Sequence, residues 1–261
     1  MMESDKKRRL LLTEERRAQI VVQLRQQGRV VAADLSQTFG VSDDTIRRDL
    51  DALAEMGVLQ RVHGGGLRRA PVNDDYAERQ TEESDAKSAI ARATAALIHP
   101  GQVVIMDGGT TSLAIATHLP ADLEATIITT SPPVAVALAA HPRLTIITIG
   151  GRLYRYAMVA VGAETVAAMA AIRADICILG VLAIHPEVGI SVIDHDEAQV
   201  KRAMIASAAT VIAPTIAAKL GTVAPFVVAP LTAVTHLVTE TGIAATTLAP
   251  YQALGIIIVQ G

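Results

Sequence analysis

Aromatic residues and cysteine are scarce in this sequence. Its 261 residues include no Trp, four Tyr, two Phe and one cysteine, Cys177. So few rings argue against the stacking platforms on which proteins bind single-stranded nucleic acid or RNA, while double-stranded DNA stays open as a partner. A lone cysteine excludes an intrachain disulfide and fits a reducing compartment. Cys177 lies in a buried-strand pattern and is assigned no function.

Long apolar runs are also absent, although 51% of the residues are hydrophobic. A membrane-spanning helix needs about 20 mainly apolar residues. The uncharged stretch 220–239 contains Pro225, Pro230 and His236, so it is interpreted as separate strands and loops. The leucines near the N-terminus form too short a run for a signal peptide. We therefore expect a cytoplasmic protein that does not enter a membrane and that uses neither a cofactor nor a metal.

The net charge of −3 is unevenly distributed along the chain. Residues 1–70 hold 13 Lys and Arg against 10 Asp and Glu, whereas residues 71–261 hold 10 against 16. Segments of opposite sign suggest different partners. The residue pattern changes as well, from helical and then briefly extended to alternating strands and helices. We predict an N-terminal domain over 1–68, a polar linker over 69–86 and a C-terminal domain over 87–261.

The C-terminal domain is predicted to be an α/β fold with a mostly parallel sheet. Runs of β-branched residues alternate with Ala-rich helices, a pattern typical of parallel strands that are covered on both faces. The expected strands are 103–106, 126–130, 144–149, 175–181, 210–213, 236–239 and 256–259.

The N-terminal domain has the pattern of a helix-turn-helix. We expect a first helix that ends at Gly28 and a second over 33–39 that ends at Gly40, because glycine tolerates the left-handed conformation of a helix end. Ser42 is then placed to cap a third helix, its hydroxyl accepting a hydrogen bond from a free amide of the first turn. The three helices together predict a DNA-binding domain.

The third helix is predicted to carry the DNA-reading face. Ile46, Leu50 and Leu53 recur at spacings of four and three and form a buried stripe. The opposite face and its flanks present the candidate DNA-binding residues Asp44, Thr45, Arg47 and Arg48. Arginine can bond a guanine edge or a phosphate, threonine can bond either, and Asp44 can accept from a cytosine amine. A solvated surface is the alternative for any one of them.

A small β-wing is predicted after the third helix. Alternating residues over 58–63 run into a turn at Gly64 and Gly65. Arg61 and His63 are candidates for contacts with phosphates or the minor groove.

Candidate effector-binding residues gather at strand ends in the C-terminal domain. The first expected strand runs into a loop of Asp107, Gly108, Gly109, Thr110 and Thr111. Glycine amides, threonine hydroxyls and a helix N-terminus favour an anion, so the loop is a candidate phosphate cradle; a plain turn is the alternative.

Two further groups complete the candidate effector site. Ser131 and Gly151 follow other expected strands, and ligands of open α/β sheets collect at such ends. Glu197 and Lys201 are four residues apart on one helix face. Lys201 is a candidate for binding an anionic sugar, and an ordinary helix ion pair, worth about 0.2–0.5 kcal/mol, is the alternative.

These residues resemble the DeoR family of bacterial transcriptional regulators. The helix-turn-helix signature of that family is matched by Arg16, Ile20, Leu24, Ser42, Thr45, Ile46, Arg47, Arg48, Asp49 and Leu50, and its wing by residues 61–65. Its effector domain is matched by Lys87, Ile90, Ala91, the 107–111 loop, Gly150, Gly151 and residues 200–202. The resemblance extends over most of residues 13–259. It implies a winged helix-turn-helix followed by a domain of sugar-phosphate isomerase type.

The resemblance also implies a function. We expect a homo-oligomeric repressor, a dimer or tetramer, that binds double-stranded operator DNA of a sugar or polyol operon and is released by a phosphorylated sugar metabolite. One alternative is an isomerase or transferase that uses Asp107, Glu197 and Lys201 as acid and base. Another is a ligand-blind regulator, because the loops at Thr130, 181–183 and 213–216 lack polar groups usual in the family.

Overall fold

The computed structural model describes residues 12–73 and 75–261. The chain forms two compact units, here called the N-terminal unit (Met1–Arg69 with Gly221–Val223) and the C-terminal unit (Ala70–Leu220 with Ala224–Gly261). The segment 69–86, expected to be a linker, contains helix α4 (Tyr76–Thr81) and the start of α5 (Ser84–Ala95). The exact domain limits stay a prediction.

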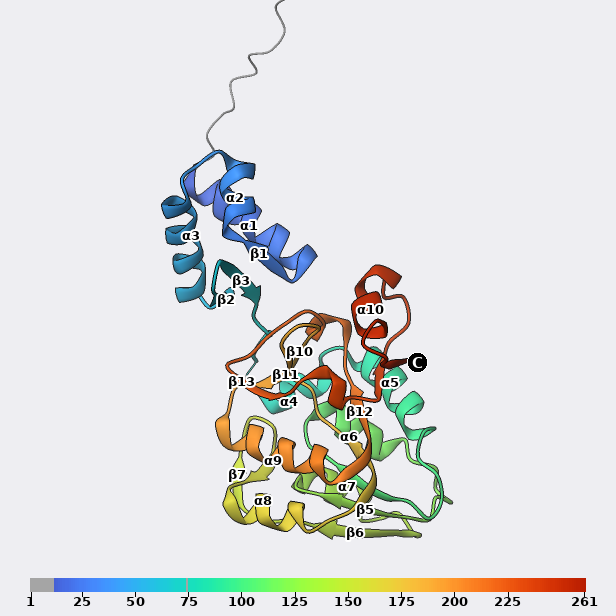
Figure 1. Ribbon diagram of the computed structural model, residues 1–261. Helices are drawn as coiled ribbons and strands as arrows, with labels where there is room; N and C mark the ends of the chain where they lie inside the picture. Colours follow the sequence, from blue (N-terminus) through green and yellow to red (C-terminus); the bar gives the residue numbers. More distant parts are fainter. Residues whose placement is uncertain (1–11, 74) are drawn as a thin grey trace, which may run out of the picture. The chain divides into compact units, whose positions relative to one another are not determined.

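The N-terminal unit contains three helices and a small antiparallel sheet of strand order β1-β3-β2 (Figure 1). The elements are α1 (Thr13–Gln27), β1 (Arg29–Val31), α2 (Ala32–Phe39), α3 (Asp43–Glu55), β2 (Leu59–Val62) and β3 (Gly65–Arg68). Strand β1 is too short to carry an alternating pattern, and the sequence did not predict it. The three helices and the hairpin of the wing are confirmed.

The helix ends of the N-terminal unit have the predicted chemistry. Gly28 and Gly40 adopt left-handed conformations with φ of 73° and 65°. The Ser42 hydroxyl accepts a hydrogen bond from the Thr45 amide at 3.3 Å. The predicted stripe of α3 is buried against α1 and α2, with Ile46 and Leu50 fully inaccessible to solvent. Burial of each such side chain contributes about 1.5–3 kcal/mol, so the stripe fixes α3 with its polar face outward.

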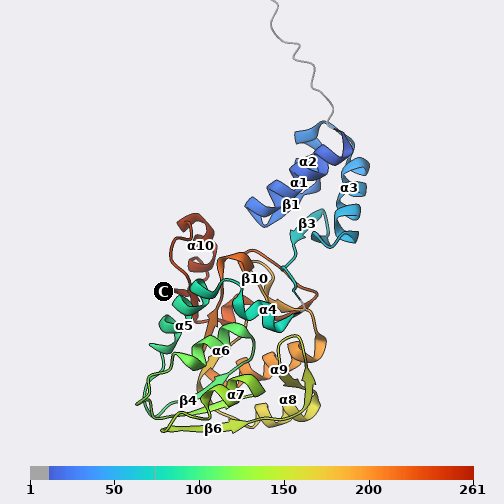
Figure 2. The ribbon, with the colours of Figure 1, turned by 180° about the vertical axis from the view of Figure 1, so that it is seen from behind.

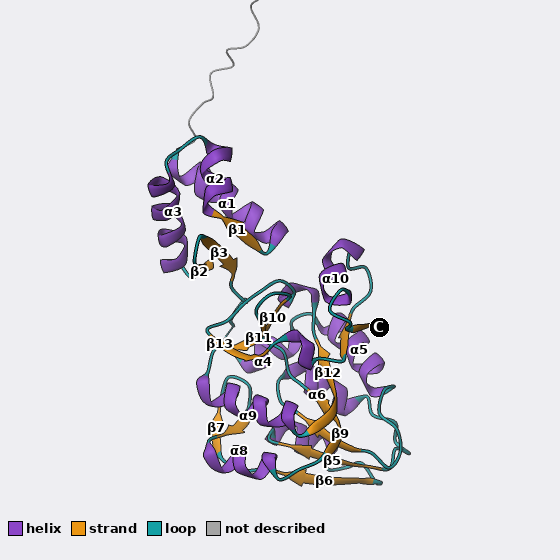
Figure 3. Cartoon of the chain, in the orientation of Figure 1, coloured by secondary structure: helices purple, strands orange, loops and turns teal. Residues whose placement is uncertain are grey.

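The C-terminal unit is built on a seven-stranded sheet of order β15-β14-β12-β9-β4-β5-β6; Figure 3 labels β5, β6, β9 and β12 of this sheet. Its strands are β4 (Val103–Met106), β5 (Ala125–Thr129), β6 (Leu144–Thr148), β9 (Ala174–Ile178), β12 (Ala208–Pro214), β14 (His236–Thr239) and β15 (Ile257–Gln260). Every neighbouring pair is parallel. The predicted α/β class and the seven predicted strands are therefore confirmed.

Helices cover both faces of this sheet (Figure 1 and Figure 2). Helices α5 (Ser84–Ala95), α6 (Thr110–Thr117) and α7 (Pro132–Leu138) share one apolar core, and α8 (Ala163–Ala170), α9 (His195–Ala206) and α10 (Ala245–Gln252) share the other. Along β4, Val104 and Met106 point into the first core and Ile105 into the second, as strand pleating requires. Burial on both faces explains why a central strand such as β4 is apolar, whereas the edge strands β6 and β15 are largely exposed.

Two small antiparallel additions were not predicted. One is the hairpin of β7 (Arg152–Tyr154) and β8 (Val159–Val161), and the other is a sheet of β10 (Ala183–His185), β11 (Gly189–Val192) and β13 (Phe226–Ala229). Strands of three or four residues give too short a pattern to separate from loops. In the described part of the chain, no helix is both long and apolar enough to span a membrane.

Candidate functional site

The outward face of α3 is polar and accessible. Asp44, Arg47 and Arg48 are exposed and Thr45 is half-buried. Arg47 forms an exposed ion pair with Asp44 at 3.3 Å, and the Thr45 hydroxyl lies 2.9 Å from that of Ser42. Among the described residues, none forms a hydrogen bond or ion pair with the Arg48 side chain. Helix α3 thus presents donors of the kind that read base edges in a major groove.

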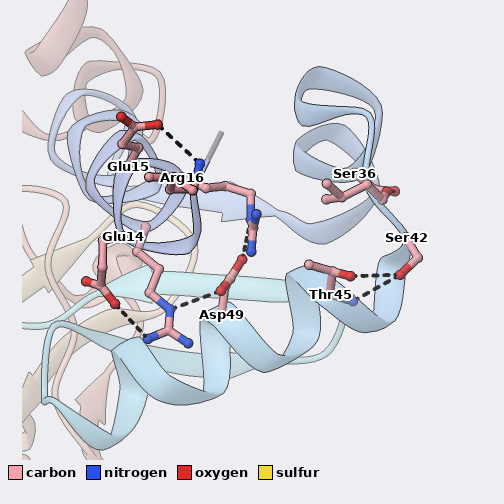
Figure 4. A network of polar contacts seen from close by, with 10 residues as sticks. Glu14, Glu15, Arg16, Ser36, Ser42, Thr45 and Asp49 are labelled. Carbon is pink, nitrogen blue, oxygen red and sulfur yellow. Dashed lines mark hydrogen bonds and ion pairs between the residues drawn. The ribbon is translucent and has the colours of Figure 1, made fainter. Parts of the chain in front are cut away.

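A buried carboxylate joins α3 to α1 (Figure 4). Asp49, only 2% exposed, accepts hydrogen bonds from Arg16 Nε at 2.6 Å and Arg17 Nε at 3.0 Å. The sequence analysis assigned Asp49 no role of its own. A signal was available, because Asp49 directly precedes Leu50 and follows Ile46 by three residues, which places an acid at the edge of the apolar stripe. Such a position requires a cationic partner.

The wing is a tight hairpin whose turn is formed by His63 and Gly64, both exposed. Gly64 has φ of 79°, a conformation that favours glycine. Arg61 does not project from the wing, because its Nε donates to Asp51 Oδ1 at 2.8 Å and its Nη1 to the Gly65 carbonyl at 2.6 Å. Arg61 therefore ties the wing to α3, and His63 is the predicted wing side chain that reaches solvent.

Gly65 is buried where β3 pairs with β1, so we expect Gly65→Ala to destabilise the N-terminal unit. A Cβ atom at Gly65 would lie 2.1 Å from the Val30 carbonyl oxygen. Overpacking of this kind costs about 1–3 kcal/mol or more. Thermal unfolding followed by circular dichroism measures the loss. Gly150→Ala is the control, because no atom lies within 4 Å of its added methyl and its φ is not positive; equal losses for both variants would contradict the role given to Gly65.

The C-terminal unit contains a pocket of about 200 Å³ at the carboxyl ends of β4 and β9. Of the candidate effector-binding residues, it brings together Gly108, Gly109, Thr110, Thr111, Glu197 and Lys201. The other lining residues are Pro71, Val72, Asn73, Arg79, Glu82, Glu83, Lys87, Tyr156, Ala157, Gly180, Val181, Leu182, Ile216 and Lys219. The glycine loop and the α9 pair, distant in sequence, therefore share one cavity.

Asp107 lies beneath the pocket and holds its parts together. Its carboxylate accepts hydrogen bonds from the amides of Gly108 at 2.7 Å and Gly180 at 2.9 Å, and forms a buried ion pair with Lys201. Lys201 also donates to the Gly180 carbonyl at 2.8 Å and lies 3.4 Å from Glu197 Oε1. Lys201 is thus part of a buried charge network, and its charge is largely balanced there.

Burial and the neighbouring charges shift the pKa values of Lys201 and Glu197. Burial lowers the pKa of Lys201, but the negative charges of Asp107 and Glu197 outweigh it, so the pKa is raised above its ordinary value. For Glu197, burial is the largest effect and raises the pKa despite the nearby Lys201. Within the described residues, Glu197 Oε2 has no hydrogen-bond partner although it is buried. This oxygen is available to accept a hydrogen bond from a ligand in the pocket.

Three cations that the sequence analysis did not select also surround the pocket. They are Arg79 of α4, Lys87 of α5 and Lys219, which donates to the Val181 carbonyl at 2.5 Å. Burial, together with the positive charges of Lys87 and Arg79, lowers the pKa of Lys219 to about 8. Lys219 is more than 130 residues from Lys87 in sequence, so only the fold brings them together. Lys87 belongs to the matched family motif, which was the one available signal.

One wall of the pocket is the segment formed by residues 71–73 and 75–83, here called the strap. Asn73 Nδ2 donates to Glu82 Oε1 at 2.7 Å, which folds the strap onto itself. The Arg79 guanidinium lies 4.0 Å from the ring centre of Tyr156 and donates to the Tyr156 carbonyl. Lys87 donates to the carbonyls of Arg79 and Glu82. These contacts hold the strap against the pocket, although none of the α4 residues is buried.

Ser131 and Gly151 do not line the pocket. Ser131 is 1% exposed and lies under the glycine loop, where a Cβ added to Gly108 would come within 3.1 Å of the Ser131 Cβ. Gly151 lets the chain approach α8, because an added Cβ would lie 2.1 Å from Thr165 Oγ1. Both positions support the loops that form the pocket, and their part in effector binding stays a prediction.

The two units together define a DNA-binding transcriptional regulator with a sensor domain: an exposed polar helix beside a wing, and an α/β unit with a charged pocket. Residues 16–69 match the DeoR-like helix-turn-helix domain, and residues 82–241 match the DeoR C terminal sensor domain. The chain belongs to the DeoR family of transcriptional regulators.

Curated relatives are similar in sequence to the chain over most of their length. The HTH-type transcriptional repressor GlcR of Bacillus subtilis (strain 168) is 33% identical over 229 residues, which are 87% of this chain and 88% of GlcR. The glycerol-3-phosphate regulon repressor of Escherichia coli (strain K12) is 34% identical over 187 residues, 71% of this chain and 74% of that protein. Ribose 5-phosphate isomerase A of Methanocaldococcus jannaschii has a TM-score of 0.36 at 15% identity, covering 51% of this chain and 52% of its own. The protein is a regulator, and the enzyme alternative is set aside.

Proposed function

We propose that this protein represses a sugar or polyol catabolic operon and leaves its operator when a phosphorylated sugar metabolite binds the pocket of the C-terminal unit. Relatives named as repressors, one of them of a glycerol-3-phosphate regulon, support the proposal. We further propose that it acts as a homo-oligomer in the cytoplasm, because paired operator half-sites need paired reading helices.

On the DNA side, we assign base and phosphate contacts to the face of α3 and to the tip of the wing. Thr45, Arg47 and Arg48 are accessible along one side of α3, with Asp44 beside them. Ser42 contributes as the cap that starts this helix. At the wing, His63 reaches the DNA, while the remaining candidates, Arg61, Gly64 and Gly65, give the hairpin its shape.

The observation that carries the effector proposal is the meeting of three cations with the glycine loop in one pocket. Residues 71–261 hold more acidic than basic residues, yet Arg79, Lys87 and Lys219 surround the same cavity as the Gly108 and Gly109 backbone. A phosphate group carries about two negative charges near neutral pH and accepts several hydrogen bonds. Arg79, Lys87 and Lys219 offset the negative charges of Glu82, Glu83 and Glu197 in the pocket lining, so the pocket can accept an anion even within an acidic domain.

Thermal unfolding in the presence of sugar phosphates tests the proposal. A ligand that binds only the folded protein raises its melting temperature. We expect one of glycerol 3-phosphate, glucose 6-phosphate, fructose 6-phosphate or ribose 5-phosphate to raise it and to weaken binding to an operator selected from random duplexes. The same compound without its phosphate is the control and does neither. If no phosphorylated compound stabilises the protein, the ligand-blind alternative stands.

Lys219 gives the effector affinity a specific pH dependence. Because its pKa in the free protein is about 8, Lys219 is mostly charged at pH 7 and mostly neutral at pH 9. We expect effector affinity to fall by about tenfold over this range, since the neutral amine no longer attracts the phosphate. Isothermal titration calorimetry measures the affinity. In the control variant Lys219→Arg the charge persists, so its profile is expected to be flat; a flat profile in the unaltered protein would exclude Lys219 from the phosphate contact.

A further inference from the structure

Two adjacent arginines of α1 meet one buried carboxylate of α3, and they differ in exposure. Arg16 binds Asp49 Oδ2 and its side chain is 7% exposed. Arg17 binds Asp49 Oδ1 and its side chain is 25% exposed. Arg16 therefore belongs to the interior, while Arg17 reaches from the same carboxylate to the surface.

Arg17 is only partly neutralised by the carboxylates around it. Its partner Asp49 also accepts a hydrogen bond from Arg16. Glu14 lies 3.6 Å from Arg17 Nη1, but the Glu14 side chain is 88% exposed, so water screens most of that attraction. Arg17 Nη2 has no partner among the residues that the structure describes. Arg17 thus keeps a partly uncompensated positive charge and an open donor at the surface of the N-terminal unit.

Because Arg17 is bound to Asp49, the position of Asp49 on α3 places the positive charge of Arg17 beside the reading face. Successive helix residues are separated by 100°, so Asp49 is one step around the helix from Arg48 and one turn after Thr45. With 2% exposure, Asp49 itself does not reach a base. In helix-turn-helix proteins the recognition helix, here α3, enters the major groove, and the sugar-phosphate strands run along both edges of that groove. A cation on α1 at the flank of α3 is therefore placed for the strand that borders the groove.

We propose that Arg17 binds a DNA phosphate and that Asp49 is the positioning residue that holds it there. A fixed guanidinium loses less conformational freedom on binding than a free one, and it can bond Asp49 and a phosphate oxygen through different nitrogens. This proposal gives a function to Asp49, the acid that directly follows Arg47 and Arg48 in the sequence.

The salt dependence of DNA binding tests the phosphate contact. A duplex of mixed sequence is the probe, because a phosphate contact does not depend on sequence. Each phosphate neutralised contributes about 0.9 to the slope of log affinity against log salt concentration. We expect Arg17→Ala to lower that slope by about this amount and to weaken binding several-fold. Arg25→Ala, an exposed change in the last turn of the same helix, is the control and leaves the slope unchanged. An unchanged slope in Arg17→Ala overturns the contact.

Two further variants test the positioning role of Asp49. Arg17→Lys keeps the charge but not the fork that can bond two oxygens at once, so we expect it to restore only part of the lost slope; full restoration overturns the positioning role. Asp49→Asn removes a negative charge, and charge counting alone predicts tighter DNA binding. If Asp49 positions Arg17, the Asp49→Asn variant instead binds DNA more weakly. If Asp49→Asn fails to fold, as circular dichroism would reveal, the Arg17→Lys result decides.

Discussion

Replacing Arg48 with Ala lowers the affinity for operator DNA by about 5- to 150-fold, which corresponds to about 1–3 kcal/mol for one well-formed arginine contact to a base. Arg48 is exposed at the centre of the outward face of α3, opposite the stripe buried by Ile46 and Leu50. Its side chain makes no hydrogen bond or ion pair with any described residue, so its removal leaves the fold unchanged. Fluorescence anisotropy with the selected operator, at one fixed salt concentration, measures the loss.

The comparison of operator with unrelated DNA separates two origins of this loss. If Arg48 contacts a base, the Arg48→Ala variant loses more affinity for the operator than for a duplex of mixed sequence. If Arg48 contacts a phosphate, the variant loses the same affinity for both duplexes. Arg25→Ala serves again as the control, since Arg25 is also exposed but lies in the last turn of α1, outside the reading face of α3. Unchanged operator affinity in Arg48→Ala would remove this residue from the reading face.

Replacing Lys201 with Met destabilises the C-terminal unit by about 3–5 kcal/mol, the usual cost of leaving a buried charge without its partner. Asp107 is 2% exposed and Glu197 is 5% exposed, and both rely on Lys201 for charge balance. Urea unfolding followed by circular dichroism measures the change in the free energy of unfolding. The double variant Lys201→Met with Asp107→Asn removes both charges of the pair, so we expect it to recover part of the loss.

The pH dependence of stability gives an independent check on Lys201. Its pKa in the folded protein is raised above the ordinary lysine value by Asp107 and Glu197, against the opposing effect of burial. Its stabilising contribution is therefore complete below the unfolded-state pKa, about 10.4, and is lost as the pH rises through the folded-state value. The Lys201→Met variant lacks this alkaline loss. A loss of the same size in both proteins would show that the network contributes little.

Local patterns made much of the N-terminal unit predictable. The spacing of Ile46, Leu50 and Leu53 determines which side of α3 faces outward, and Gly28 and Gly40 mark helix ends through their own backbone preferences. The central strands of the parallel sheet were predictable because burial on both faces makes them apolar runs rich in β-branched residues. These signals lie within a few residues of one another, so no knowledge of the fold is needed to find them.

Contacts between distant residues were not predictable in the same way. Asp107 and Lys201 are 94 residues apart, and only the β4 and β9 strand ends bring them to one cavity. Arg79 lies in a polar segment that gave no sign of burial, and its contact with Tyr156 depends on a hairpin too short to predict. Asp49 could have been found, because an acid at the edge of an apolar stripe demands a partner, but nothing local indicates which arginine of α1 that partner is.

The strap places a thermodynamic constraint on the proposed regulation. Pro71, Val72 and Asn73 line the pocket and are also among the first residues after Arg69, the last residue of the main segment of the N-terminal unit. The proposed release of the operator by a metabolite requires that the two binding events be linked, and this segment is the chain connection between the units. Such coupling is reciprocal: if the metabolite weakens operator binding by a given factor, the operator weakens metabolite binding by the same factor. Protein bound to its operator is then the less sensitive sensor, and higher metabolite concentrations are needed to release it than to saturate the free protein.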